Sequence, residues 1–533
     1  MLPLRVATLN LRSLLCAGLL ALVSLPAPSS GQASTSDAGG GSRSVVRRGT
    51  VARARPKARR AARRPPPPPL VATTPFGIAA LRSDLGSLLE ARVKQGTWGV
   101  LVTSVSRGDT LFGRNADQPL RPASTQKLFT TVLAFERLGV HHQIVTEVLR
   151  DGSLDADGTL RGSLVLRGGG DPALAGRFLG GSPESPMRAL AQMVANAGIR
   201  RVTGDVVGDA SAFENQRIPD GWLSRYLGAS YAARVSALSL NANLLHVAVA
   251  PGKGTRPTVS LHPGLAGFPV VNNARVTGTS RSARLVVSRR SDRTIVVSGW
   301  IGKRSETRVY TVVVEDPATF ATAAFRQALE DAGIDVAGKV RLGTAPAQAI
   351  TVGALTSPPI AQLARVMNGE SDNHFAELLL RDAARGRDPA IVGSARLGNE
   401  QLRALLAERA GTTPAGISIA DGSGLSSLNR VTPRALTELL MYADRAPWSR
   451  EFHESLPIAG ASETLRSRMV GTSAQRNLHA KTGTTNDVIS LGGYVTSRGG
   501  ELLAFTVFYN GSERWNARET IDAIGATLAG FAR

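Results

Sequence analysis

A serine and a lysine three residues apart could form a nucleophile and its base. Ser124 and Lys127 lie in PASTQKLFTT, residues 122–131, where the pattern predicts the start of a helix. Residues three apart on a helix share one face, so a neutral lysine there could take the serine's proton. Only 7 of the 63 basic residues are lysine, and arginine cannot serve as such a base. The alternative is an N-capping serine beside a surface lysine.

A second lysine begins the tripeptide K-T-G at Lys481, Thr482 and Gly483. The following residues alternate as in a strand, and a glycine there lets a ligand lie against the backbone. An ammonium group beside hydroxyls can bind a carboxylate. This tripeptide is therefore a candidate for substrate binding.

A third polar group, Ser371 and Asn373, falls at a predicted junction between two helices in ESDNHFAE. The pattern S-x-N also occurs at residues 239–241 and 427–429, so spacing alone does not choose among the three. Each of them could also be a helix cap or a turn.

The ordered set S-x-x-K, S-D-N and K-T-G resembles that of penicillin-binding proteins and active-serine β-lactamases. The chain resembles the low-molecular-mass class C penicillin-binding proteins, which are D-alanyl-D-alanine carboxypeptidases and endopeptidases. The separation of 247 residues between Ser124 and Ser371 distinguishes that family from its shorter relatives, because it carries extra domains between the first two motifs. Further similar stretches are GGGDPAL (168–174), GDVVGDASAF (204–213), SALSLNAN (236–243) and DGSGLSSLNRVTP (421–433). The resemblance extends from about residue 80 to the C-terminus.

The resemblance implies that Ser124 is the acylated nucleophile and that Lys127 is its base. Ser371 would relay a proton to the leaving amine, and Asn373 would bind the peptide backbone of the substrate. The backbone N–H groups of Ser124 and Thr484 would form the oxyanion hole.

The resemblance also assigns substrate contacts. Lys481 would supply positive potential that helps to keep the base neutral. Thr482 and Thr484 would hold the terminal carboxylate of the substrate, with Gly483 between them. Asp209 matches a family position that approaches the cleft, although a turn at the end of a strand is the alternative for this residue.

These residues need a scaffold that combines helices and strands. Strands are predicted in residues 98–115 and 479–511, and helices dominate residues 358–445. Strands near both ends predict one α+β domain whose sheet is closed by both halves of the chain. The resemblance implies a penicillin-binding/β-lactamase-like transpeptidase fold, an antiparallel sheet flanked by helices plus an all-α subdomain, with inserted β-rich domains.

Composition divides the chain into four predicted parts. Residues 1–33 are a secretory signal peptide, and residues 34–75 are a basic, proline-rich, disordered linker. The catalytic domain is discontinuous, at 76–150 and 349–533. The inserted β-rich accessory region, 151–348, is expected to form two small domains.

The N-terminus predicts export to the periplasm or cell-wall space of a bacterium. Arg5 and Arg12 precede an apolar run of 12 residues, 14–25, shorter than the roughly 20 that span a bilayer as a helix. Cleavage after Ala33 would remove Cys16, the single cysteine of the chain. The mature protein would then have no disulfide, cysteine nucleophile or cysteine metal site.

The charge is concentrated near the N-terminus. The formal net charge is +22, and residues 1–75 contribute +11, from 12 basic residues and one acidic residue. In an exported protein, an anionic wall polymer or lipid headgroup is a better partner for this tail than nucleic acid. A solvated spacer is the equally weighted alternative.

Other hydrolase classes lack their motifs. No E-x-x-L-N of class A β-lactamases, no G-x-S-x-G and no H-E-x-x-H occurs, and His141 and His142 are interpreted as a surface pair. We therefore expect no metal and no cofactor. The favoured hypothesis is an exported serine DD-peptidase that acts on peptidoglycan stem peptides and cross-links and is acylated by β-lactam antibiotics. The alternatives are a non-catalytic wall-binding protein and an active-serine β-lactamase or esterase.

Overall fold

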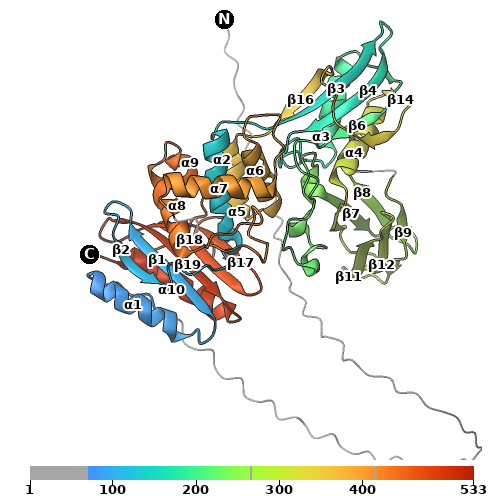
Figure 1. Ribbon diagram of the computed structural model, residues 1–533. Coiled ribbons are helices and arrows are strands. Elements are labelled where there is room, and N and C mark those ends of the chain that lie inside the picture. The colour runs from blue at the N-terminus through green and yellow to red at the C-terminus, as the bar shows by residue number, and fades with distance from the viewer. Residues whose placement is uncertain (1–69, 265–266, 413–415) are drawn as a thin grey trace, which may run out of the picture. The chain divides into compact units, whose positions relative to one another are not determined.

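The computed structural model describes residues 70–264, 267–412 and 416–533 (Figure 1). The predicted signal peptide and residues 34–69 of the predicted basic linker lie outside this range. Among the helices of the described ranges, none combines the length and the apolar character that crossing a membrane requires.

A five-stranded antiparallel sheet joins the two ends of the described chain, in the order β17-β18-β19-β1-β2. Val100 in β1 lies opposite Val507 in β19, so the early and late parts of the chain meet at the centre of the sheet. The strands are β1 (Thr97–Ser104), β2 (Thr110–Arg114), β17 (His479–Thr484), β18 (Val488–Thr496) and β19 (Leu502–Asn510). Strand β17, which carries K-T-G, lies at one edge.

Helices cover both faces of this sheet. On one face α1 (Ile78–Ala91) and α10 (Arg514–Gly530) pack side by side (Figure 1). The buried residues Leu81, Leu85 and Leu88 recur at helical spacing along α1 and form that contact. On the other face, α8 (Pro433–Arg445) packs against β1 and β19.

A helical layer adjoins the same sheet. It contains α2 (Gln126–Leu138), α5 (Ile360–Glu370), α6 (Asn373–Arg385), α7 (Ala395–Arg409), α8 and α9 (Ser449–Glu454). Helix α2 is at its centre: it contacts α5, α6, α7 and α8, and 11 of its 13 residues are buried. Gly139, with φ 83°, ends it.

The start of α2 differs from the sequence prediction. The sequence predicts a helix start at Pro122 or Ser124, but α2 begins at Gln126 after a single 3₁₀ turn, η1 (Ala123–Thr125). Ala123 has φ 48°, a left-handed conformation that interrupts a regular helix. Ser124 therefore lies in the tight turn that precedes the helix.

A seven-stranded sheet begins the inserted region. Strand β3 pairs with β16, so that Val145 lies opposite Thr356 where the chain leaves and rejoins the helical layer. The strands are β3 (Val145–Leu154), β4 (Thr159–Gly168), β5 (Arg201–Val202), β6 (Val206–Asp209), β14 (Asp335–Val336), β15 (Val340–Leu342) and β16 (Ile350–Thr356). Helices α3 (Ser185–Asn196) and α4 (Pro317–Asp331) pack against each other and against this sheet.

Two smaller sheets complete the inserted region. One contains β7 (Leu244–Ala250), β8 (Thr258–His262) and β13 (Arg308–Val313), and the other contains β9 (Val270–Asn272), β10 (Arg275–Thr277), β11 (Ala283–Arg289) and β12 (Ile295–Gly302). Short 3₁₀ turns are η2 (Ser224–Tyr226), η3 (Ser230–Ala232), η4 (Asn241–Asn243) and η5 (Glu463–Leu465). Val148, Val247 and Ile295, one from each sheet of the region, belong to one continuous buried cluster. The domain boundaries given above stay a prediction.

Candidate active site

The predicted nucleophile and base are hydrogen-bonded. Nζ of Lys127 lies 3.2 Å from Oγ of Ser124. The tight turn of η1 presents Ser124 half-buried at the surface of the helical layer, whereas the first turn of α2 buries Lys127 completely. A substrate can thus reach the hydroxyl, while the amine is shielded from water.

Lys127 has two further oxygen partners. Its Nζ donates to Oδ1 of Asn373 over 2.7 Å and to the backbone carbonyl of Ser423 over 2.8 Å. A neutral amine has two hydrogens, which these two oxygens can accept, so its lone pair would face the Ser124 hydroxyl. This arrangement suits a general base.

Burial lowers the pKa of Lys127 from 10.5 to about 8. The negative charges of Asp421, Asp372 and Glu377 oppose this shift by stabilising the ammonium form. Near neutral pH a fraction of Lys127 is therefore the neutral amine that can take a proton.

The second lysine connects the K-T-G strand with the S-D-N turn. Nζ of Lys481 donates to Oγ of Ser371 over 3.0 Å and to the carbonyl of Thr482 over 2.9 Å. Burial and, to a smaller degree, the positive charge of Lys127 hold the pKa of Lys481 well below its usual value. Ser371 has φ 60°, a left-handed conformation at the junction of α5 and α6.

Glycine at 483 allows strand β17 to approach η1 closely. A Cβ at Gly483 would lie 2.9 Å from the backbone nitrogen of Ser124 and 2.1 Å from Oγ of Ser490. Ser490 itself donates to the carbonyl of Pro122 over 2.7 Å, which fastens the sheet to this turn. Thr484, the next residue along β17, is exposed.

Asn373 begins α6, and Asp372 caps that helix by accepting the backbone N–H of Phe375. The side chain of Asn373 links the predicted base to the inserted region. Oδ1 accepts from Lys127, and Nδ2 donates to the carbonyl of Tyr231, in the inserted region, over 2.9 Å. The predicted residues thus form two hydrogen-bonded groups: Lys127 joins Ser124 and Asn373, and Lys481 joins Ser371 and Thr482.

Sequence reasoning missed the loop that supports Lys127. The backbone N–H groups of Gly422 and Ser423 donate to the carboxylate of Glu377, at 3.3 and 3.0 Å, and Glu377 also pairs with Arg381 at 3.1 Å. Burial, reinforced by the charge of Asp421, raises the pKa of Glu377 to about 7. Two features of the sequence point to this loop. One is Glu377, a charged residue on the buried face of α6, and the other is the stretch DGSGLSSLNRVTP at 421–433.

The structure does not bring Asp209 to this site. Its two carboxylate oxygens accept from the backbone N–H groups of Ser211 and Ala345, at 2.9 and 2.8 Å, at the end of β6. It lines a cavity of about 560 Å³ together with Leu138 and Asp382, which lie toward the C-terminal ends of α2 and α6. Ser124 and Asn373 lie near the opposite, N-terminal ends of those helices. The geometry therefore favours the alternative interpretation of Asp209, a turn at the end of a strand.

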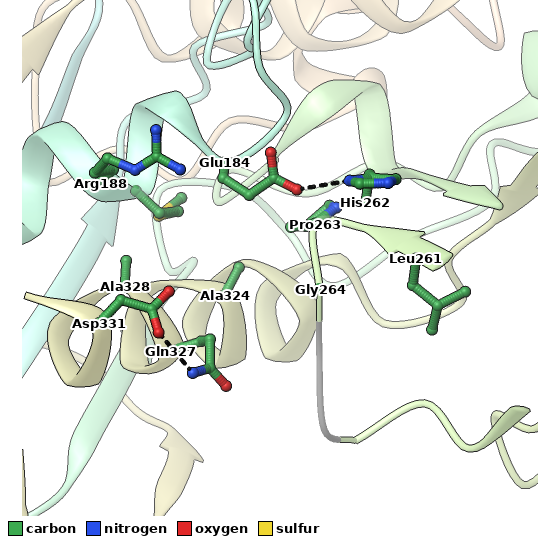
Figure 2. Close-up of a pocket in the computed structure, with 11 residues that line it drawn as sticks. Glu184, Arg188, Leu261, His262, Pro263, Gly264, Ala324, Gln327, Ala328 and Asp331 are labelled. Atoms are coloured by element: carbon green, nitrogen blue, oxygen red, sulfur yellow. Dashed lines mark hydrogen bonds and ion pairs between the residues drawn. The ribbon is translucent and has the colours of Figure 1, made fainter. Parts of the chain in front are cut away.

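A separate cavity of about 390 Å³, with a mixed polar and apolar lining, lies in the inserted region between α3, α4 and the end of β8 (Figure 2). There Nδ1 of His262 donates to the carboxylate of Glu184 at 3.1 Å, and Gln327 donates to Asp331 at 3.1 Å. None of the predicted site residues lines it. Within the described ranges, no cluster of three or more His, Cys, Asp or Glu residues is arranged to hold a metal ion.

Comparison with known proteins adds to this geometry. The sequence profile of the D-Ala-D-Ala carboxypeptidase 3 (S13) family matches residues 81–530. The chain belongs to this S13 family. The resemblance to low-molecular-mass class C penicillin-binding proteins is thereby confirmed, and the protein is a serine-type D-Ala-D-Ala carboxypeptidase.

Two S13 relatives show how far the similarity extends. The D-alanyl-D-alanine carboxypeptidase of Actinomadura sp. (strain R39) is 33% identical over 472 residues, which cover 85% of each chain. The D-alanyl-D-alanine carboxypeptidase DacB of Haemophilus influenzae is 27% identical over 420 residues, 78% of this chain and 85% of that protein. Both alignments are long enough to include the catalytic and the inserted regions.

The fold agrees with that of solved relatives. The crystal structure of penicillin binding protein 4 (dacB) from Haemophilus influenzae aligns with a TM-score of 0.71 at 25% identity, covering 84% of this chain and 99% of that one. A complex of the same protein with a novel β-lactam aligns with a TM-score of 0.66 at 25% identity, covering 82% and 97%. The predicted α+β, penicillin-binding type of fold is confirmed.

Proposed function

We propose that this S13 enzyme cleaves the D-alanyl-D-alanine bond of peptidoglycan stem peptides through an acyl-enzyme on Ser124. Lys127 removes the hydroxyl proton as Oγ attacks the carbonyl carbon of the penultimate D-alanine. The backbone N–H groups of Ser124 and Thr484 stabilise the resulting oxyanion, each contributing on the order of 3 kcal/mol.

Collapse of the tetrahedral intermediate breaks the bond to the terminal D-alanine. The leaving nitrogen takes up the proton that Ser124 lost, passed from Lys127 through the hydroxyl of Ser371. Water then attacks the ester carbonyl, with Lys127 again accepting a proton, and restores Ser124. The net reaction consumes one water and releases one D-alanine.

The same groups bind the substrate before it reacts. Lys481, Thr482 and Thr484 hold the terminal carboxylate, and Asn373 binds the peptide backbone. Gly483 keeps strand β17 close to Ser124, so that carboxylate and scissile carbonyl lie along one edge. Asp209 has no part in this assignment, because its carboxylate is bonded to backbone N–H groups.

The main support is the 3.2 Å hydrogen bond between Lys127 and Ser124, made by an amine that is buried and whose pKa is lowered to about 8. A merely structural lysine at a helix start would remain exposed and charged. The link from Lys481 to Ser371 is a second, independent support.

Mass spectrometry of the mature protein after reaction with benzylpenicillin tests the nucleophile. We expect a stable adduct on Ser124 that is absent from Ser124→Ala. An adduct on another residue would refute the assignment of Ser124, and no adduct on the wild type would refute the acyl-enzyme mechanism. Rapid loss of the adduct would instead favour the β-lactamase alternative.

Cleavage of cross-links is part of the proposal. The D-alanyl cross-link offers the same carbonyl with a larger leaving amine, so one catalytic set serves both reactions. Incubation with purified cross-linked muropeptide dimers should give monomers with the wild type and none with Ser124→Ala. Release of D-alanine alone would restrict the enzyme to carboxypeptidase activity.

We also propose export, with the basic segment at 34–75 bound to an anionic wall polymer or lipid headgroup. The ten basic residues and one acidic residue of this segment are its support. Co-sedimentation with purified anionic wall polymer should weaken with added salt and with removal of residues 34–69. Binding that survives this removal would assign the contact to the folded part.

A further inference from the structure

The carboxylate of Asp421 organises the loop that supports Lys127. Asp421 is fully buried and accepts five hydrogen bonds. Four come from residues 423–429: Ser423 Oγ at 3.2 Å, Gly424 N at 2.8 Å, Ser426 N at 2.6 Å and Asn429 Nδ2 at 2.7 Å. These bonds fold the loop around one negative charge.

The fifth donor comes from the inserted region. Nε1 of Trp222 donates to Oδ2 of Asp421 over 2.8 Å, although 199 residues separate the two in the chain. The indole is nearly fully buried, with 8% of the residue exposed. A buried donor on a buried carboxylate forms a strong, charge-assisted hydrogen bond.

Neighbouring residues hold Trp222 in place. Ser426 Oγ donates to the carbonyl of Asp220 over 2.6 Å, and Ser427 N donates to the carbonyl of Gly221 over 3.0 Å. Gly221 has φ 76°, and a Cβ there would lie 2.4 Å from Ser426 Oγ. The segment 220–222 is thus joined to the loop along its whole length.

The same loop governs the base. The carbonyl of Ser423, two residues after Asp421, accepts from Nζ of Lys127 over 2.8 Å. The charge of Asp421 is also the largest of those that favour the ammonium form of Lys127. Any change at Asp421 therefore reaches the amine both through a hydrogen bond and through its electric field.

We infer that Trp222, from the inserted region, is a positioning residue for the catalytic base: its indole N–H fixes the Asp421 carboxylate and through it the Ser423 carbonyl that orients Lys127. The inference rests on the proposed role of Lys127. It gives the inserted region a part in the acylation step.

Trp222→Phe removes the N–H and keeps an aromatic ring. Asp421 retains four donors, but one N–H fewer offsets its negative charge, so it stabilises the Lys127 ammonium more strongly. The pH at which acylation by a fluorescent penicillin reaches half its maximum should rise by about one unit, and the rate at pH 7 should fall about tenfold. The dissociation constant of the complex before acylation should not change.

Trp98→Phe is the matched control. Trp98 is also buried, in β1, but its Nε1 has no hydrogen-bond partner within the described ranges. This variant loses an indole N–H with a similar change in volume, and its acylation profile should match the wild type. A role in stability alone would lower the melting temperature of Trp222→Phe and leave its pH profile unchanged, which would overturn the inference.

A second measurement needs no variant at position 222. In wild-type protein with ¹⁵N-labelled tryptophan, the Trp222 indole signal should shift with a midpoint near pH 8, following Lys127. The signal is assigned by elimination: a phenylalanine variant of each of the other four of the five tryptophans removes one signal, and the signal that remains in all of them belongs to Trp222. A signal that is constant from pH 6 to 10 would overturn the inference. If the wild type is not acylated at all, the proposed function fails, and this titration still decides the link to Trp222.

Discussion

The side-chain nitrogen of Lys481 donates a 3.0 Å hydrogen bond to the hydroxyl of Ser371, although 110 residues separate them in the chain. The bond ties the edge strand β17 to the junction of α5 and α6. Lys127 lies near enough for its charge to lower the pKa of Lys481. Two buried lysines therefore share one small site, and the charge of Lys127 disfavours the charged form of Lys481.

Replacing Lys127 by arginine should abolish acylation. Arginine remains charged at every accessible pH, so it cannot accept the Ser124 proton, and loss of a general base costs roughly 10²- to 10⁴-fold in rate. The second-order rate of acylation by a fluorescent penicillin measures this. Lys94→Arg, at an exposed lysine after α1, is the matched control and should match the wild type. If Lys127→Arg were acylated at the wild-type rate, Lys127 would be excluded as the base.

The acylation rate should rise with pH and level off above about pH 8. The neutral amine of Lys127 is the reactive form, and its pKa lies near 8, so lowering the pH protonates it and removes the base. Rates from pH 6 to 10 at constant ionic strength give the profile. A rate that falls between pH 7 and 8.5 would contradict a lysine base.

Gly483→Ala should impair catalysis far more than folding. The added Cβ would meet the backbone nitrogen of Ser124 at 2.9 Å and push β17 away from η1. A displacement of about 1 Å at a reacting centre can cost on the order of 10²-fold in rate. Gly86→Ala, inside α1 with no atom within 4 Å of the new Cβ, should leave acylation unchanged and stabilise the protein by up to about 1 kcal/mol. Equal acylation rates in the two variants would contradict this account.

Glu377 should make stability depend on pH in a defined direction. Its pKa is about 7 in the folded protein against 4.5 when exposed, so the folded state binds more protons between these values. The free energy of unfolding contributed by Glu377 therefore falls as pH rises from about 4.5 to 7, by up to about 3 kcal/mol. The difference between Glu377→Gln and wild type should change across this window, as measured by urea unfolding.

An exposed carboxylate provides the control for this measurement. Glu408→Gln, at an exposed position of α7, should give a difference from wild type that is constant with pH. If Glu377→Gln behaves in the same way as Glu408→Gln, the carboxyl of Glu377 does not titrate as proposed.

The residues proposed for catalysis can be found by sequence reasoning because their chemistry is local or carried by motifs. Ser124 and Lys127 lie one helical turn apart, so spacing alone predicts that they can meet. Ser371 and Lys481 are far apart in the chain, and only the family resemblance brought them together. The exact start of α2 was missed because the left-handed backbone of Ala123 has no distinct signature in residue type.

The residues that hold Lys127 in place could not be predicted from the sequence, for a different reason. Lys127 is held by the carbonyl of Ser423, a backbone atom that every residue type possesses. The contact between Trp222 and Asp421 depends on how the inserted region packs, which no local pattern specifies. Asp209 shows the converse: a family match placed it at the cleft, but its burial at a strand end depends on tertiary pairing of β6 with its neighbours.

The pairing of Val145 with Thr356 has an evolutionary consequence. The chain enters and leaves the inserted region at adjacent points. A single genetic event could therefore add or remove this region without changing the chain connectivity of the catalytic domain. A lineage that lost the region would nevertheless leave the Asp421 carboxylate without its indole donor. Such a descendant would have to acquire another donor at that position before its lysine regained the same reactivity.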